Sequence, residues 1–185
     1  MLDKAIDMPE LFKALEFAAF KHKDQRRKGP ENLPYINHPI QVAGMLISVG
    51  EEYNTNLLIA AILHDTIEDT DTTEEEIQRV FGDKVAELVM EVTDDKNLYW
   101  EARKQLQIET SPFASYEAKL LKIADKVCNV RDLVVNPPEK WTLERKLEYL
   151  DWACDVVEGV RGTNEALENI FDEWITKARK FYNTV

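Results

Sequence analysis

The sequence predicts an all-α protein, a single compact domain of about 8–10 helices. Apolar residues recur at helical spacing along nearly the whole chain, whereas the alternation typical of strands is weak. Proline and glycine interrupt these stretches, and no interruption is long enough to separate two domains. A length of 185 residues also suits one domain with a substantial core. We therefore expect 1–185 to form one domain.

The first two helices flank a basic loop. We expect one helix after Pro9, where an apolar stripe begins at Leu11, and a break at the loop 26–30 (RRKGP). The second helix should begin at Asn37, whose side chain suits an N-cap, with a proline in its first turn. Gly50 is expected to end this helix.

The middle of the chain predicts a buried helix and two amphipathic ones. The stretch 55–68 is apolar nearly all round in its first half, which is typical of a central helix. Thr73 and Glu76 fit a capping box at the start of the next helix. Gly82 then separates it from a further apolar stripe over 85–92.

The last third predicts three longer helices. A preceding helix should break at 111–112 (SP), and helical spacing then continues over 115–135. The strongest break of the chain is 136–138 (NPP). Two more helices are expected over 142–160 and 163–181.

The charge balance limits the classes of partner. Hydrophobic residues make up 44% and charged residues 31%, as in a soluble globular protein. The 23 basic and 35 acidic residues give a net charge of −12, which argues against nucleic-acid and anionic-membrane binding. An anionic small molecule must therefore meet local positive charge or a metal ion.

The two cysteines and the apolar runs indicate a cytoplasmic protein. Cys128 and Cys154 form no CxxC pair, which favours a reducing compartment. We see no signal peptide at the N-terminus. The longest strongly apolar run, 57–63, is far too short to span a membrane.

A polar cluster follows the most apolar segment. Adjacent His64 and Asp65 would project about 100° apart on a helix, which suits two ligands of one metal ion. Glu68 and Asp69 follow Asp65 by three and four residues and share its face. A divalent cation would offset the cost of acidic groups at a helix C-terminus. The alternative is a solvated helix end, and a His-Asp pair alone does not decide between them.

His38 and Asp125 are two further candidate ligands. His38 opens the second helix, and the alternative for a lone histidine is a capping or core role. Asp125, Asn129 and Asp132 follow an i, i+4, i+7 pattern, so one polar stripe can face a site. The alternative for this stripe is a salt-bridged face exposed to solvent.

Together these residues form a plausible ligand set without thiolate: His38, His64, Asp65 and Asp125. Two imidazoles and two carboxylates suit Mn, Fe, Co or Zn, and an octahedral ion would keep positions open for water and a phosphate oxygen. A zinc site held by cysteine is excluded by ligand type.

Six motifs resemble the HD-domain superfamily and, within it, the hydrolase half of the RelA/SpoT family. The similarity is closest to the short, stand-alone small alarmone hydrolases, including the metazoan SpoT homologues. It extends over about residues 10–180, and the motifs stand in the family's order. They are RRK (26–28), PYINHP (34–39), HDTIEDT (64–70), EVTDDK (91–96), KIADKVCNVRD (122–132), and Trp141 with GTN (162–164).

The resemblance implies a role for each matching residue. It implies four ligands for one Mn²⁺ ion: His38, His64, Asp65 and Asp125. It implies a pair that positions or activates the attacking water: Glu68 and Asp69. It implies substrate contacts from Arg26, Arg27, Lys28, Asn129, Arg145 and Tyr149.

The chain departs from the family pattern near Trp100, where relatives tend to have a lysine that faces the phosphates. Here that cation could come from Lys96, Arg103 or Lys104 instead. The departure leaves the phosphate contacts and the substrate preference open.

The resemblance implies hydrolysis of guanosine 3′,5′-bis(diphosphate) (ppGpp or pppGpp) to GDP or GTP and pyrophosphate. Adenosine alarmones such as ppApp, or the 2′-phosphate of NADPH, are alternative substrates of the same pocket. A nucleotidase acting on 5′-monophosphates and an inactive binding module are further alternatives. We expect no synthetase or regulatory domain within 1–185. The oligomeric state stays open.

Overall fold

Helices account for nearly all regular structure in residues 5–183, the part of the chain that the computed structural model describes. Within that part, nine helices have eight or more residues, α4 is a single turn, and an isolated bridge pairs Arg26 with Pro34. The all-α prediction is therefore confirmed. The helices are α1 (Met8–Lys21), α2 (Asn37–Ser48), α3 (Thr55–Leu63), α4 (Thr66–Asp69), α5 (Glu74–Phe81), α6 (Asp83–Val92), α7 (Trp100–Thr110), η1 (Ser111–Phe113), α8 (Tyr116–Val135), α9 (Leu143–Glu158) and α10 (Glu165–Asn183).

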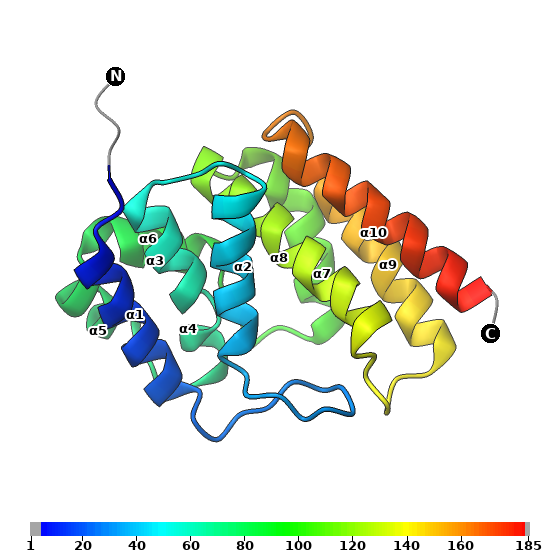
Figure 1. Cartoon of the computed structure of the whole chain (residues 1–185), viewed down its shortest axis with the longest axis horizontal. Coiled ribbons are helices and arrows are strands. Elements are labelled where there is room, and N and C mark those ends of the chain that lie inside the picture. Colours follow the sequence, from blue (N-terminus) through cyan, green and yellow to red (C-terminus); the bar gives the residue numbers. More distant parts are fainter. Residues whose placement is uncertain (1–4, 184–185) are drawn as a thin grey trace.

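Two buried helices organise the core. Every residue from Leu57 to Leu63 in α3 is buried, and α3 packs against α1, α2, α6 and α8 (Figure 1). Helix α8 contacts α2, α6, α9 and α10, so it joins the first half of the chain to the last. None of the helices in 5–183 is long and apolar enough to cross a lipid bilayer.

Side-chain caps fix several helix starts near the predicted positions. At six of them a side-chain oxygen accepts a hydrogen bond from the backbone N–H three residues further on, which satisfies one donor of the first turn. These caps are Asp7, Asn54, Thr73, Ser115, Thr142 and Asn164. The predicted Thr73 cap is confirmed, while the carboxylate of Glu76 accepts from Lys21 across the surface.

The predicted helix over 55–68 is wrong in one respect, because it breaks after Leu63. The Thr66 hydroxyl donates to the Leu63 carbonyl at 2.6 Å, and this local bond competes with the helical pattern. His64 and Asp65 therefore lie in a two-residue turn between α3 and α4 rather than on one continuous helix.

The bounds of α2 correct two further predictions. Asn37 is the first helical residue, and Ile36 holds the N-cap position without a side-chain cap. Helix α2 ends at Ser48, and the left-handed residue beyond it is Glu51, with φ 54°, rather than Gly50. Gly50 is instead needed for space, since a Cβ there would lie 2.8 Å from the Leu46 carbonyl oxygen.

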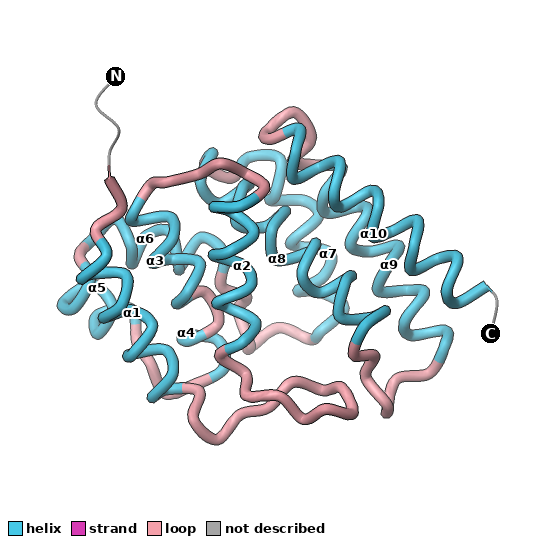
Figure 2. Tube along the Cα trace, viewed as in Figure 1, coloured by secondary structure: helices cyan, strands magenta, loops and turns pink. Residues whose placement is uncertain are grey.

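Two long loops lie along the same edge of the molecule, the loop between α1 and α2 and the loop between α8 and α9 (Figure 2). They meet at Gly29 and Asn136. A Cβ on Gly29 would come within 2.1 Å of Asn136 Oδ1, so only glycine allows this approach. The basic loop is thereby held against the end of α8.

Candidate metal centre and adjoining pocket

Four polar side chains from three regions of the chain come close together near the first turn of α2. His38 lies in the first turn of α2, His64 and Asp65 lie in the turn after α3, and Asp125 lies in the middle of α8. The Nε2 atoms of His38 and His64 lie 3.0 and 3.8 Å from Asp125 Oδ1. The same two atoms lie 3.7 and 3.1 Å from Asp65 Oδ2.

The ligand atoms of His38, His64 and Asp65 all lie within 4.8 Å of one another, close enough to share a divalent metal ion. Asp125 approaches the two imidazoles but stands outside this group of three. Two ligand atoms about 2.1 Å from one ion lie about 3 Å apart when they subtend a right angle. The Nδ1 of His64 lies 2.8 Å from the Ala61 carbonyl, which fixes the tautomer and leaves the Nε2 lone pair on the cluster side. This buried Nε2 has no hydrogen-bond partner among residues 5–183. A metal ion would satisfy it.

Three of the four side chains, His38, Asp65 and Asp125, are in the charge state that metal binding requires. Burial opposes ionisation of Asp65, but the neighbouring His64 outweighs it and holds the Asp65 pKa well below its usual range. Burial likewise opposes ionisation of Asp125, and Lys126 outweighs it and lowers the Asp125 pKa. Burial lowers the pKa of His38 and favours its neutral form. Burial acts in the same direction on His64, but the Asp65 carboxylate outweighs it and raises the His64 pKa to about 9. Because ionised carboxylates and neutral imidazoles are the forms that bind metals, His64 must release a proton when an ion binds.

Further side chains orient the two carboxylates. Tyr35 donates its hydroxyl to Asp65 Oδ2 at 2.6 Å. Lys126 donates to Asp125 Oδ2 at 2.9 Å, and Asn129 donates to Asp125 Oδ1 at 2.6 Å. Such partners limit rotation of a ligand and commonly affect metal affinity.

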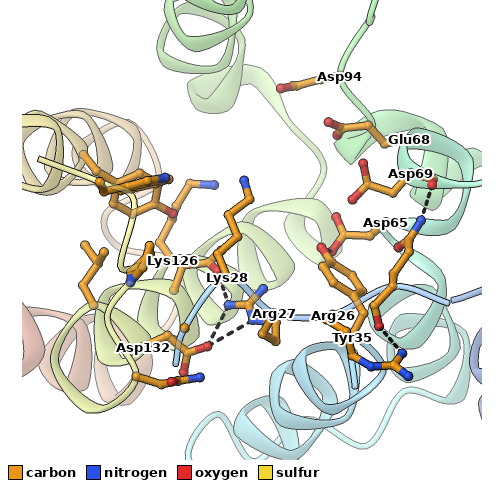
Figure 3. A pocket seen from close by; sticks show the side chains of 18 of the residues that line it. Arg26, Arg27, Lys28, Tyr35, Asp65, Glu68, Asp69, Asp94, Lys126 and Asp132 are labelled. Carbon is orange, nitrogen blue, oxygen red and sulfur yellow. Dashed lines mark hydrogen bonds and ion pairs between the residues drawn. The ribbon is translucent and has the colours of Figure 1, made fainter. Parts of the chain in front are cut away.

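A cavity of about 570 Å³ opens beside the cluster, and its walls carry opposite charges. In Figure 3 the carboxylates of Asp65, Glu68, Asp69 and Asp94 line one side. The cationic groups of Arg27, Lys28 and Lys126 lie across from them. A phosphorylated ligand could therefore meet metal and cations at once.

The predicted catalytic pair lies at the cavity, on the single-turn helix α4. Arg103 lies 3.3 Å from Glu68 Oε1, and Lys96 donates to Asp69 Oδ1 at 2.8 Å. Burial raises the Glu68 pKa to about 7, and the Asp94 carboxylate adds to this effect. A carboxylate with such a pKa can accept a proton near neutral pH.

The three basic-loop residues line the cavity in different ways. Arg27 bonds Asp132 at 2.7 Å and Asn129 at 2.9 Å, which ties the loop to α8. Lys28 lies over the Trp141 ring at 5.8 Å. Arg26 donates to two carbonyl oxygens of its own loop.

Arg145 and Tyr149 occupy different places around the pocket. Tyr149 lines the 570 Å³ cavity beside the cluster, called the metal cavity below. Arg145 lines two neighbouring cavities, and its guanidinium carbon lies 4.5 Å from the centre of the Trp141 ring. The structure thus brings Tyr149 to the cavity beside the metal cluster and places Arg145 in the two neighbouring cavities.

The cations proposed to replace a lysine near Trp100 all have other partners. Lys96 and Arg103 pair with the acidic side chains of α4. Lys104 lies 5.0 Å from the Trp100 ring and 5.2 Å from the Trp152 ring.

Three residues at the site were not predicted from the sequence. Tyr35 lies within one of the motifs, but its bond to Asp65 depends on a loop fold that periodicity cannot show. Lys126 lies beside a predicted ligand, and its adjacency to Asp125 was the available signal. Gln25, which donates to the Asp69 carbonyl, gave no signal that we could identify.

The fold and the candidate site both correspond to those of one known protein family. A model of the HD domain matches residues 14–150, and the chain therefore belongs to the HD-domain family. Within this family, the proteins named below as similar to the chain are short relatives of SpoT, the group that the sequence motifs resemble. The predicted resemblance is therefore confirmed.

Several curated relatives carry the name guanosine-3′,5′-bis(diphosphate) 3′-pyrophosphohydrolase MESH1. The Danio rerio protein is 52% identical over 158 residues, covering 85% of this chain and 88% of the relative. The Homo sapiens protein is 51% identical over 168 residues, covering 89% and 94%. A solved structure of a metazoan ortholog of SpoT that hydrolyses ppGpp has a TM-score of 0.89 at 47% identity, covering 91% of this chain and 94% of that one.

Proposed function

We propose that this protein hydrolyses guanosine 3′,5′-bis(diphosphate) to GDP and pyrophosphate, and pppGpp to GTP and pyrophosphate, with Mn²⁺ as cofactor. The observation that carries the proposal is the cluster of His38, His64, Asp65 and Asp125 at the wall of a cavity with cations opposite. The activity named for relatives about half identical to this chain supports the same substrate.

The four clustered residues would hold the ion. Two imidazoles and two carboxylates suit Mn²⁺ among other divalent ions. A bound divalent cation supplies Lewis acidity and makes water a stronger acid. The buried position of the ligands keeps their geometry fixed as substrate enters and leaves.

The pair on α4 would handle the proton of the attacking water. Glu68 accepts the proton, and Asp69 orients the water while its own carboxylate is held by Lys96. Water oxygen forms the new bond to phosphorus, the bond from phosphorus to the 3′ oxygen breaks, and that oxygen takes up a proton. Pyrophosphate and the free 3′-hydroxyl are the products.

The remaining predicted residues would bind the nucleotide. Arg27, Lys28 and Asn129 lie across the cavity from the acidic side chains. Tyr149 and Arg145 extend this surface toward the rim, and Arg26 lies on the same loop. Cations in this position stabilise negative charge that develops during phosphoryl transfer.

Product analysis tests the proposal directly. We expect metal-stripped protein to be inactive, and added Mn²⁺ to yield GDP and pyrophosphate in equal amounts from ppGpp, measured by mass-resolved chromatography. Parallel reactions with ppApp, NADPH and GMP establish the preference. Faster release of phosphate from NADPH or GMP than of pyrophosphate from ppGpp would contradict the proposal. A cytoplasmic location stays a prediction.

A further inference from the structure

Lys126 is a buried cation at the centre of the site. It is 5% exposed and lies on α8 directly after Asp125. Its side chain lines the metal cavity, on the side opposite the acidic residues of α4 (Figure 3). A lysine is almost never buried unless its charge is paired, so this position needs a specific partner.

The two oxygens of Asp125 have separate partners. Oδ1 lies 3.0 Å from His38 Nε2, on the side of the metal cluster. Oδ2 accepts a hydrogen bond from Lys126 Nζ at 2.9 Å, on the side of the cavity. Oδ1 also accepts a hydrogen bond from Asn129 at 2.6 Å. Lys126 on one oxygen and Asn129 on the other together restrict rotation of the carboxylate and keep Oδ1 directed at the imidazoles.

A second contact fixes the ammonium group itself. Lys126 Nζ lies 4.6 Å from the centre of the Trp152 ring, within the range of a cation–π interaction. Trp152 is in turn held by its indole N–H, which donates to the Lys104 carbonyl at 3.1 Å. An ammonium has three N–H donors, and within 5–183 only Asp125 accepts a hydrogen bond from this one.

Several other cations near the cavity pair with carboxylates, whereas Lys28 lies over the Trp141 ring and Arg26 donates to carbonyl oxygens of its own loop. Lys96 and Arg103 pair with the acidic side chains of α4. Arg27 is held by two side chains of α8. Lys126 is therefore the cation that combines contact with a candidate metal ligand, burial and donors still available on the cavity side.

We infer that Lys126 positions the metal ligand Asp125 and also receives the phosphate group that binds beside the metal. This inference rests on the proposed function. It supplies a phosphate-facing cation that the sequence left open near Trp100, and it places that cation on α8 rather than α7. The chemistry it recognises is a diphosphate bound to a divalent ion.

The test uses binding measurements that need no turnover. Mn²⁺ affinity is measured by calorimetric titration of the metal-free protein, and pyrophosphate affinity by titration of the Mn²⁺-loaded protein. The variants are K126M, which removes the charge at similar size, and K126R, which keeps it. K122M is the matched control, because Lys122 is also buried on α8, one turn earlier, and does not line the cavity.

We expect K126M to weaken Mn²⁺ binding by about 10–100-fold, the usual effect of losing a partner of a metal ligand. Pyrophosphate binding should weaken by at least about tenfold, the loss of a charge-assisted hydrogen bond. K126R should recover most of both, and K122M should match wild type. If K126M does not melt cooperatively, K126Q replaces it under the same criteria.

Either affinity staying within twofold of wild type in the charge-free variant would overturn the inference. So would equal losses in K122M, because that pattern would indicate a general effect of burying fewer charges on α8. Failure of the wild-type protein to hydrolyse ppGpp would count against the proposed function alone, since both affinities are measured without substrate.

Discussion

The two sides of the pocket are built differently. The proposed metal ligands come from helices or the short turn between two of them, and both histidines are buried, His38 at 2% and His64 at 7% exposure. Most of the facing cations lie on the loop between α1 and α2, and their partners are aromatic rings and α8 side chains. On the proposed function, the core would fix the reaction chemistry, whereas substrate recognition would depend on how the loop is held.

The largest effect should follow from loss of a core ligand. Asp125→Ala should abolish turnover and the rise in melting temperature on addition of Mn²⁺, because three ligands and an unpaired Lys126 remain. Asp125→Asn, which keeps the shape, should give the same result. Activity assays and thermal melts with and without Mn²⁺ measure both effects. The control is Asp155→Ala on the exposed face of α9; turnover surviving in either Asp125 variant would mean that the metal site is wrong.

A smaller loss should result from removing the proton acceptor while keeping the metal. Glu68→Gln should lower kcat about 10²–10³-fold, because a general base contributes in that range. Mn²⁺ affinity should stay within a few-fold of wild type, since Glu68 is not among the clustered ligands. Steady-state kinetics and metal titration test the two statements. A parallel loss of metal affinity would assign Glu68 to the metal instead.

Displacing the loop should change binding more than chemistry. Gly29→Ala would place a Cβ 2.1 Å from Asn136 Oδ1, so the loop must shift. We expect KM for ppGpp to rise about tenfold, with kcat and Mn²⁺ affinity nearly unchanged, because on the proposed function the loop binds the substrate and the metal ligands lie outside it. Gly44→Ala is the matched control, since nothing lies within 4 Å of a Cβ there. A fall in kcat with unchanged KM would show that loop and core are not separable.

The smallest expected effect is on how the free energy of unfolding of the metal-free protein depends on pH. Burial, aided by Asp94, raises the Glu68 pKa from 4.5 to about 7, so the folded state binds this proton more tightly than the unfolded state. The resulting stability is present below pH 4.5 and is lost as pH rises through about 7. Glu68→Gln should therefore flatten the decline over this window by an amount of order 1 kcal/mol. Urea unfolding at pH 5 and pH 7.5 measures it, and identical profiles would contradict the prediction.

Most of the fold could be predicted because its signals are local. Helical spacing located the helices, and Thr73 was recognisable as a cap because its partner is three residues away. The break after Leu63 was missed, since a hydroxyl that bonds a carbonyl leaves the apolar period unchanged. Gly50 was assigned to a helix end, although packing against Leu46 explains it.

The site was predictable to the extent that its residues interrupt apolar helices. His64 and Asp125 stand out because polar groups there need a partner. Lys126 was not recognised, since a lysine on a helix usually extends to solvent, and only the packing of Trp152 shows that this one does not. The position of Arg145 relative to the metal could not be predicted, because the loop 136–142 sets it.

Helix α8 also gives the pocket a fixed length. Asp125 contacts His38 in the metal cluster, and Asn129 and Asp132 both contact Arg27 of the basic loop. Asn136 contacts Gly29 of the same loop. At 1.5 Å per residue, the span from the first to the last is about 16 Å. On the proposed function, a ligand that reaches both the metal site and the far end of the loop must therefore span about that length.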